Sequence, residues 1–231
     1  MNVVITGASR GIGFETCKAF LKNGDTVFAI ARSKKKLEEL TKFKQNGYLY
    51  IIVADLSVDD GLKKCIKEIK SNSNYVDVLI NNAGYLVHKS FETTTQEDFQ
   101  KSIAVNLHVP YFFTQGILPL FEGSKFPQII NIGSMGGYAG SSKFPGLSIY
   151  STSKGALATL TECLAEELKG KNIKVNCLAL GAVQTEMLEQ AFPGYEAPIQ
   201  SIEMASFIFD FAMQSSKFIN GKIIPVSLNT P

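Results

Sequence analysis

Tyr150 and Lys154 are the two side chains of this sequence best placed for acid–base chemistry. They stand four residues apart in Tyr150-Ser151-Thr152-Ser153-Lys154, at the start of a segment with helical periodicity. That spacing puts both side chains on one face of a helix. A free phenol has a pKa near ~10, and an ammonium about 4 Å away stabilises the phenolate by about 4 kcal/mol at an effective dielectric constant of about 20. We therefore expect Lys154 to lower the pKa of Tyr150 and let it exchange a proton with a carbonyl or alcohol oxygen.

Two more polar residues are expected beside this pair. Ser134 directly follows the apolar run Gln128–Ile132, and its hydroxyl can bind the same substrate oxygen and fix its orientation. Asn106 interrupts an otherwise helix-forming stretch, where it could bend the helix and hold a water molecule on a proton path to Lys154. The candidate catalytic residues are therefore Asn106, Ser134, Tyr150 and Lys154.

A glycine-rich turn, Thr6-Gly7-Ala8-Ser9-Arg10-Gly11-Ile12-Gly13, follows the first apolar run and opens a helical pattern. Gly7 permits a sharp turn, Gly11 lets the backbone approach a pyrophosphate, and Gly13 lets the helix pack closely on a sheet. The helix N-terminus adds free N–H groups and the positive end of its dipole. A strand before the glycines and a helix after them are the context that a dinucleotide-binding turn requires.

The residues after the second apolar run indicate which dinucleotide is bound. An acidic residue at this point binds the ribose 2′-OH of NAD, whereas an arginine accommodates a 2′-phosphate. Here the run ends Ile30-Ala31-Arg32-Ser33, with no acid, and Arg10 of the glycine-rich turn can approach the same place. Two guanidinium groups and a hydroxyl suit a phosphate. We predict NADP(H), with NAD(H) as the alternative; the following basic run, Lys34-Lys35-Lys36, indicates a solvated helix face.

Polar residues also follow the third and fourth apolar runs. Asp55 ends the third and could accept a hydrogen bond from an adenine amino group. The fourth ends in Asn81-Asn82-Ala83-Gly84, where consecutive asparagines suit a tight turn whose side chains tie loops together.

Short apolar runs alternate with helical stretches along the chain. The predicted strands are Val3–Ile5, Thr26–Ile30, Tyr48–Val53, Val76–Ile80, Gln128–Ile132, Ile173–Leu178 and Lys222–Val226. The predicted helices are Gly11–Leu21, one capped by Ser33 and running to Phe43, one capped by Ser57 and running to Ile69, Gln96–Phe121 with a bend near Pro110, Tyr150–Lys169 and Ser201–Gln214. Strands apolar on consecutive positions are buried on both faces. We therefore predict an α/β fold, a Rossmann-like doubly wound parallel sheet of about seven strands with helices on both faces.

Composition limits the remaining classes of protein. The 231 residues are 45% hydrophobic and 19% charged, which suits one well-filled domain over residues 1–231. A net charge of +2 gives no basic surface for nucleic acid, and no apolar stretch approaches the ~18 residues of a membrane span. The cysteines lack metal-ligand spacing, and the N-terminus lacks a signal-peptide pattern. We expect a soluble cytoplasmic protein with no metal, nucleic-acid or membrane partner.

Taken together, these motifs resemble the short-chain dehydrogenase/reductase family in its compact single-domain branch. The resemblance spans nearly the whole chain through Thr6–Gly13, Asp55-Leu56, Asn81–Gly84, Asn106, Ser134 and Tyr150-x-x-x-Lys154. It implies an Asn–Ser–Tyr–Lys tetrad in which Tyr150 is the acid/base. Lys154 would lower its pKa and bind the nicotinamide ribose, Ser134 would position the carbonyl, and Asn106 would support a water relay.

The resemblance also implies a cofactor site. Its residues would be Gly7, Ala8, Ser9, Arg10, Gly11, Ile12, Gly13, Arg32, Ser33, Asp55, Leu56, Asn82, Ala83, Gly84, Tyr150, Lys154, Gly181, Val183 and Thr185. Two features depart from the family pattern. Leu180-Gly181 replaces the usual Pro-Gly, and the segment Glu186–Gln200, expected to cover the site, is short. A short cover implies an open pocket or a small or extended substrate.

The expected activity is an NADP(H)-dependent interconversion of a carbonyl compound and a secondary alcohol. Fatty-acyl-type 3-oxo reductases are one resemblance. The alternatives are an NAD(H)-dependent alcohol dehydrogenase of the same family and a catalytically silent NADP-binding sensor or scaffold. In relatives, the helices that match Gln96–Phe121 and Tyr150–Lys169 form subunit contacts, so a homodimer or homotetramer is expected.

Overall fold

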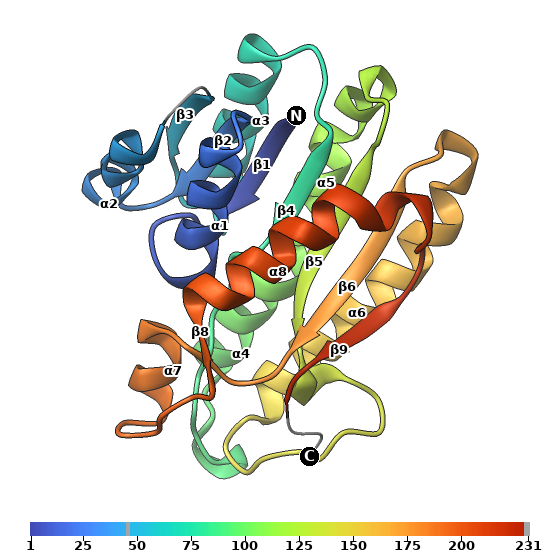
Figure 1. Cartoon of the computed structure of the whole chain (residues 1–231). Coiled ribbons are helices and arrows are strands. Elements are labelled where there is room, and N and C mark those ends of the chain that lie inside the picture. The colour runs from blue at the N-terminus through green and yellow to red at the C-terminus, as the bar shows by residue number, and fades with distance from the viewer. Residues whose placement is uncertain (45–46, 229–231) are drawn as a thin grey trace.

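A seven-stranded, all-parallel sheet forms the centre of the computed structural model, which describes residues 1–44 and 47–228 (Figure 1). The last residues of the predicted 1–231 domain, 229–231, lie outside the described part. The strand order is β3-β2-β1-β4-β5-β6-β9. The strands are β1 (Asn2–Thr6), β2 (Thr26–Ala31), β3 (Tyr48–Val53), β4 (Val78–Asn81), β5 (Gln128–Ser134), β6 (Lys174–Leu180) and β9 (Ile223–Val226). All seven predicted strands and their parallel arrangement are confirmed.

The strand order determines where a ligand-binding crevice can form at the edge of the sheet. β1 lies between β2 and β4, with Val4 opposite Phe28 on one side and Leu79 on the other. Along the chain, β1, β2 and β3 form one half of the sheet, and β4 then pairs with the other side of β1 and begins the second half. Connections on the two sides of this reversal leave the sheet in opposite directions, which opens a crevice at the carboxyl ends of β1 and β4. The glycine-rich turn and Asn81–Gly84 both lie at these ends.

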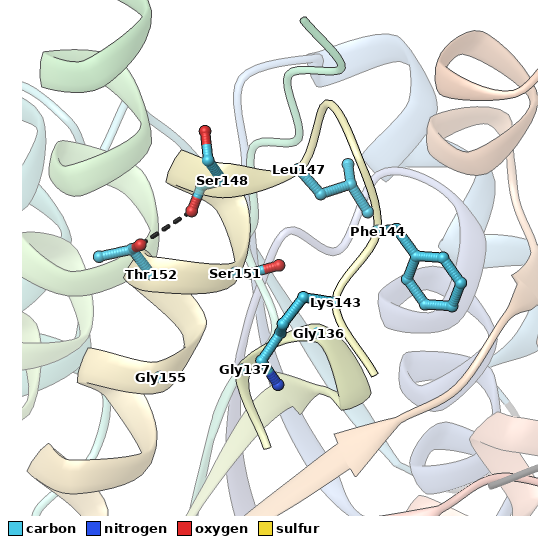
Figure 2. Close-up of a pocket in the computed structure, with 9 residues that line it drawn as sticks. All are labelled: Gly136, Gly137, Lys143, Phe144, Leu147, Ser148, Ser151, Thr152 and Gly155. Atoms are coloured by element: carbon cyan, nitrogen blue, oxygen red, sulfur yellow. Dashed lines mark hydrogen bonds between the residues drawn. The ribbon is translucent and has the colours of Figure 1, made fainter. Parts of the chain in front are cut away.

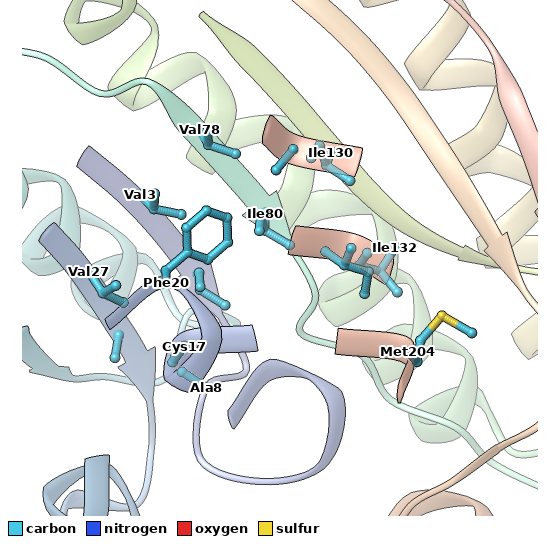
Figure 3. Packing of buried hydrophobic residues seen from close by; sticks show 14 of the residues in the cluster. Val3, Ala8, Cys17, Phe20, Val27, Val78, Ile80, Ile130, Ile132 and Met204 are labelled. Carbon is cyan, nitrogen blue, oxygen red and sulfur yellow. The ribbon is translucent and has the colours of Figure 1, made fainter. Parts of the chain in front are cut away.

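Helices cover both faces of the sheet, as predicted. One apolar cluster packs α1 (Gly11–Lys22) and α8 (Ser201–Gln214) against the strands, through residues such as Phe20 and Met204 (Figure 3). On the other face lie α3 (Asp59–Asn72), α5 (Val109–Ile117) and α6 (Ser148–Glu167). Because the sheet is buried between these layers, its carboxyl edge remains the accessible side for a ligand.

The predicted helix Gln96–Phe121 is divided in the structure. It consists of α4 (Gln96–Ile103), a π-helical turn (Ala104–His108), α5, and a 3-10 turn (Leu118–Gly123). Pro110 lies in α5, two residues after the π-helical turn ends at His108, so the irregularity of the helix falls next to this proline. The interruption lies at Asn106, as the presence of an amide in this stretch predicted.

Two predicted helix caps are wrong. Ser33 occupies the N-cap position of α2 (Lys34–Glu38), but its side chain makes no capping hydrogen bond, and a 3-10 turn (Glu39–Phe43) completes the predicted segment. α3 begins at Asp59 with Val58 at its N-cap. The hydroxyl of Ser57 donates instead to the Asp55 carboxylate at 2.6 Å, which holds a turn before the helix.

The segment 183–200 has structure that the sequence did not predict. A short parallel pair joins β7 (Val183–Gln184) to β8 (Ile199–Gln200), and α7 (Glu186–Ala191) lies between them. The hydroxyl of Thr185 caps α7 by accepting from the Leu188 N–H at 3.1 Å. The remaining 3-10 turns are Phe91–Thr93, Met135–Gly137, Lys169–Lys171 and Ser215–Lys217.

Candidate functional site

A cleft of about 1290 Å³ runs along the carboxyl edge of the sheet. Every predicted site residue lines it except Ala8 and Asn106, which are fully buried behind its wall. The structure thus brings together residues that are more than a hundred positions apart in the chain, such as Gly7 and Tyr150. Within the described ranges, no helix has the length and apolar character to cross a bilayer, and no three His, Cys, Asp or Glu residues cluster closely enough to hold a metal ion.

At the reactive end, α6 carries Tyr150 and β5 ends at Ser134. A hydrogen bond joins the side chains of these two residues. The Ser134 hydroxyl oxygen also accepts from the Gly136 N–H at 3.1 Å, so the turn after β5 fixes its position. Burial raises the pKa of Tyr150 above its usual value, and the hydrogen bond from Ser134 opposes that shift only in part. The phenol therefore remains protonated at neutral pH.

Lys154 lies one helical turn below Tyr150 and is almost completely buried. Its ammonium donates to the Ile132 carbonyl at 2.8 Å, and its Nζ lies 6.0 Å from the centroid of the Tyr150 ring. Burial lowers the pKa of Lys154 to about 8. The prediction that Lys154 lowers the pKa of Tyr150 is wrong for this structure. The physical reason is that burial disfavours the charged form of both groups and the ammonium points to a backbone carbonyl.

Asn106 connects two walls of the site from behind. Its Nδ2 donates to the Tyr85 carbonyl at 2.8 Å and to the Ser153 hydroxyl at 2.9 Å, while its Oδ1 accepts from the Tyr85 N–H at 2.8 Å. Both amide hydrogens are therefore used inside the protein. A Cβ added to Gly84 would lie at ordinary contact distances, 3.6 Å from Asn106 Oδ1 and 3.7 Å from Lys154 Nζ, which places both side chains beside Gly84. The side chain of Asn106 positions the loop after β4 against α6.

The glycine-rich turn has the geometry that the sequence predicted. Gly7 and Gly11 adopt left-handed φ values of 69° and 55°, which favour glycine. A Cβ on Gly13 would lie 2.3 Å from Asn82 Nδ2, which donates to the Thr6 carbonyl at 2.9 Å. Asn82 therefore holds the turn in place.

The N-terminus of α1 tests whether this turn fits a pyrophosphate. α1 begins at Gly11, and its N-cap Arg10 makes no side-chain capping hydrogen bond. The first N–H groups of α1 therefore lack helical and side-chain acceptors, and Gly11, Ile12 and Gly13 all line the cleft. These donors, with the helix dipole behind them, fit the pyrophosphate of a dinucleotide.

Charged side chains gather at the other end of the cleft. Arg32 Nη1 lies 3.8 Å from Asp55 Oδ2, and Arg10 Nη1 lies 2.8 Å from Glu186 Oε2. Lys36 Nζ approaches Glu186 Oε1 at 3.2 Å. Burial opposes the ionisation of Asp55, but hydrogen bonds from Ser57 and the charge of Arg32 outweigh it and hold its pKa below the usual value.

Lys36 and Glu186 are site residues that the sequence reasoning missed. Lys36 belongs to the basic run interpreted as a solvated face, and Glu186 opens a segment interpreted only as a cover. The hydrogen bonds from Arg10 and Lys36 lower the pKa of Glu186. Their position in the sequence could have identified them, because each lies within four residues of a predicted cofactor-binding residue.

The side of the cleft away from the charged cluster is aromatic. His88 Nδ1 lies 2.9 Å from the Ala191 carbonyl, and its ring contacts that of Phe192 at 4.5 Å between centroids. Tyr195 and Phe144 line the same wall. These residues come from the loop after β4, the segment around α7, and the loop between β5 and α6. The predicted short cover therefore reaches across to the loop after β4.

A smaller pocket of about 420 Å³ lies beside the N-terminus of α6 (Figure 2). Gly136, Phe144 and Leu147 line both this pocket and the main cleft, so the loop after β5 separates the two. Its hydroxyl groups include Thr152, which donates to the Ser148 carbonyl at 2.8 Å.

Comparison with known proteins identifies the family. A family model described as short chain dehydrogenase matches residues 1–196. The chain belongs to the short-chain dehydrogenase family. This short-chain dehydrogenase is 30% identical to a 3-oxoacyl-(acyl-carrier-protein) reductase of Thermotoga maritima, with 96% of this chain and 94% of that protein covered.

Solved structures agree with this assignment. A Pseudomonas aeruginosa RhlG/NADP active-site complex superposes with a TM-score of 0.86 and 28% identity, covering 98% of this chain and 94% of that one. A 3-ketoacyl-(acyl-carrier-protein) reductase of Brucella melitensis complexed with NADH gives a TM-score of 0.88 and 25% identity, covering 98% and 96%. The predicted family and its Rossmann-like fold are confirmed. The chain is an oxidoreductase of a family that binds nicotinamide cofactors and acts on small molecules.

Proposed function

We propose that this short-chain dehydrogenase is an NADP(H)-dependent oxidoreductase that interconverts a carbonyl compound and a secondary alcohol, with Tyr150 as acid/base. The observation that carries the proposal is the half-buried Tyr150, which lines the cleft with its hydroxyl hydrogen-bonded to Ser134 and lies one helical turn from buried Lys154. The proposal treats residues 1–231 as one cofactor-binding domain that acts in the cytoplasm.

The protonation of Tyr150 favours the reductive direction. When bound, the nicotinamide supplies or accepts the hydride. Because burial keeps the phenol of Tyr150 neutral, it can donate a proton to a carbonyl oxygen, and Ser134 can hold that oxygen. Lys154 would bind the nicotinamide ribose hydroxyls with the ammonium hydrogens that the Ile132 carbonyl does not use. Asn106 would position the loop after β4 against α6, because its amide hydrogens are donated to the Tyr85 carbonyl and the Ser153 hydroxyl.

The charged end of the cleft supports NADP(H). Arg10, Arg32 and Lys36 line it together with Ser33, and no carboxylate lies at the end of β2 where NAD would require one. The Pseudomonas aeruginosa complex contains NADP and the Brucella melitensis complex contains NADH, so proteins similar to this chain occur with each cofactor. NAD(H) therefore remains the competing hypothesis that the experiment below must reject.

The relatives suggest which carbonyl compounds to test. The relative from Thermotoga maritima is a 3-oxoacyl-(acyl-carrier-protein) reductase, and the Brucella melitensis structure is a 3-ketoacyl-(acyl-carrier-protein) reductase. The aromatic wall of the cleft and its large volume would accommodate an acyl chain. We also propose a homodimer or homotetramer that buries the α4–α5 surface, because Phe99, Tyr111 and Phe112 expose 42–51% of their area there.

The test is a screen for NADPH oxidation with ketones, aldehydes and 3-oxoacyl thioesters, repeated with NADH. We expect turnover with at least one carbonyl class and a higher kcat/KM with NADPH. A higher kcat/KM with NADH contradicts the cofactor proposal. Tight binding of NADPH with no turnover across the panel favours the sensor or scaffold.

A further inference from the structure

Glu186 brings two cationic side chains together at the end of the cleft. It is the first residue of α7, whereas Arg10 lies in the glycine-rich turn and Lys36 lies in α2. Glu186 Oε2 accepts from Arg10 Nη1 at 2.8 Å, and Lys36 Nζ lies 3.2 Å from Oε1 and 3.4 Å from Oε2. One carboxylate thus occupies the point where a guanidinium and an ammonium from separate elements converge.

This arrangement suits a phosphate monoester. A carboxylate and a phosphate both present charged oxygens to Arg and Lys donors, but the phosphate has three such oxygens and a charge of about −1.5 to −2. The exposed fractions of the Arg10, Lys36 and Glu186 side chains are 38%, 45% and 52%. An incoming anion can therefore reach both cations and displace the carboxylate without disturbing the core.

The cluster lies at the ribose end of the predicted dinucleotide site. Arg32 and Ser33, which end β2, line the same cleft as Arg10, Lys36 and Glu186. We propose that Glu186 is an internal anion that competes with the 2′-phosphate of NADP(H) for Arg10 and Lys36, and so lowers the preference of this chain for NADP(H) over NAD(H). The inference rests on the proposed function, because it assumes that the dinucleotide carries a 2′-phosphate.

The negative charge of Glu186 determines whether its removal tightens or weakens binding of the 2′-phosphate. With Glu186 in place, a bound 2′-phosphate must break two ion pairs and then lie beside a carboxylate of like charge. Glu186→Gln removes the charge and keeps the shape of the side chain. Because the Thr185 hydroxyl caps α7 independently by accepting from the Leu188 N–H, the variant should retain this helix. Exposed ion pairs are each worth about 0.2–1 kcal/mol, so the loss of two predicts about two- to thirtyfold tighter binding of the 2′-phosphate.

The experiment measures the contribution of the 2′-phosphate to binding, with ligands that lack the nicotinamide. Adenosine 2′,5′-bisphosphate and AMP are titrated calorimetrically into the full chain, and the ratio of their Kd values isolates the 2′-phosphate. We expect Glu186→Gln to tighten bisphosphate binding about two- to thirtyfold and to leave the Kd of AMP unchanged. Lys36→Gln should weaken the bisphosphate alone.

Matched variants control for charge and position. Glu189→Gln makes the same charge change on α7, where the Glu189 carboxylate accepts from the Gly194 N–H and contacts no cation of the cluster. Lys35→Gln makes the same change as Lys36→Gln on α2. Both controls should leave the Kd ratio at its wild-type value.

Failure of the inference differs from failure of the proposed function. The inference is overturned if the Kd ratio is the same in the wild type and Glu186→Gln, or if Glu189→Gln changes it equally. The proposed cofactor preference fails if wild-type protein binds NADPH no better than NADH. In that case, a gain in bisphosphate affinity in Glu186→Gln still supports competition by Glu186.

Discussion

The two ends of the cleft use polar side chains in opposite ways. At the reactive end, Lys154 is 4% exposed, Asn106 is 0% exposed, and the half-buried Tyr150 is hydrogen-bonded to Ser134. At the adenosine end, Arg32 and Asp55 are 74% and 41% exposed and meet only at 3.8 Å. The reactive end is a largely buried hydrogen-bonded network, whereas the adenosine end is a set of solvent-exposed ion pairs.

This difference predicts how each end of the cleft responds to amino-acid substitution. Removing one member of a buried network leaves its partners without hydrogen bonds, which costs the desolvation of those groups. Exposed ion pairs contribute little and are readily exchanged for another anion. We therefore expect large, all-or-none effects near Tyr150 and graded effects near Arg32. The following predictions test that contrast from the largest expected effect to the smallest.

Removing the Tyr150 hydroxyl should have the largest effect. Tyr150→Phe deletes the proton donor, and general acid catalysis is worth about 10²–10⁴-fold, so kcat should fall by at least about a hundredfold. NADPH affinity, measured by fluorescence titration, should change less than about twofold because the hydroxyl makes a small part of the cofactor site. Tyr138→Phe is the control, since Tyr138 does not line the main cleft. Unchanged turnover in Tyr150→Phe would disprove the acid/base role.

Deleting the Asn106 amide should destabilise the protein. Asn106→Ala leaves the buried backbone groups of Tyr85 and the Ser153 hydroxyl short of three hydrogen bonds, so the free energy of unfolding should fall by about 2–4 kcal/mol. Denaturant unfolding measures this loss. Asn74→Ala, in the exposed loop between α3 and β4, is the control for an asparagine deletion. A loss below about 0.5 kcal/mol would show that the network is not cooperative.

Reversing the charge of Arg32 should change cofactor preference in a graded way. Arg32→Asp places a carboxylate at the end of β2, where it would repel a 2′-phosphate and accept from a ribose 2′-OH. We expect the NADPH-to-NADH ratio of kcat/KM to fall on the order of tenfold, with little change in stability. Lys34→Asp, on the neighbouring helix, should leave the ratio unchanged. An unaltered ratio in Arg32→Asp would remove this residue from the cofactor site.

The last prediction concerns the pH dependence of stability. Burial lowers the pKa of Lys154 to about 8 from an ordinary 10.5, so above pH 8 the unfolded chain binds more protons than the folded one. The free energy of unfolding should therefore rise with pH, relative to Lys154→Met, by up to about 1.4 kcal/mol per pH unit between pH 8 and 10.

The comparison with Lys154→Met is needed because other groups act in the opposite direction. Burial raises the pKa values of Cys65 and Cys177 to about 12 and about 11, so these thiols lower stability as pH rises. Both thiols are present in both proteins, so the contribution of Cys65 cancels in the difference, whereas that of Cys177 cancels only in part because the charge of Lys154 lowers its pKa. A difference that stays flat from pH 7 to 10 would show that Lys154 titrates normally.

The sequence predicted the sheet and most of the cleft because those features depend on local patterns. Each strand was visible as an apolar run, and the glycine spacing of Gly7, Gly11 and Gly13 required a strand before and a helix after it. Parallel strands end at one edge, so residues that follow them must meet. Ser134 ends β5 and therefore lies at this edge.

The remaining features depend on contacts that no local pattern encodes. The pKa of Tyr150 depends on burial by distant segments, so a pair energy between Tyr150 and Lys154 alone gave the wrong sign. The contact of Glu186 with Lys36 joins positions 150 residues apart. α7 is six residues long and shows no helical period over that length, which is why the cover was predicted without structure.

The π-helical turn at Ala104–His108 also limits how this chain can vary in length. A regular helix advances about 100° per residue, so one added residue rotates everything after it by that angle. With this offset, α5 directs Phe113 and Ile117 inward while α4 keeps Asp98 and Ser102 inward. Deleting a single residue here would make the helix regular and turn one half of it away from the sheet. Homologous proteins should therefore tolerate insertions in the segment that holds α7 and conserve the residue count between α4 and α5.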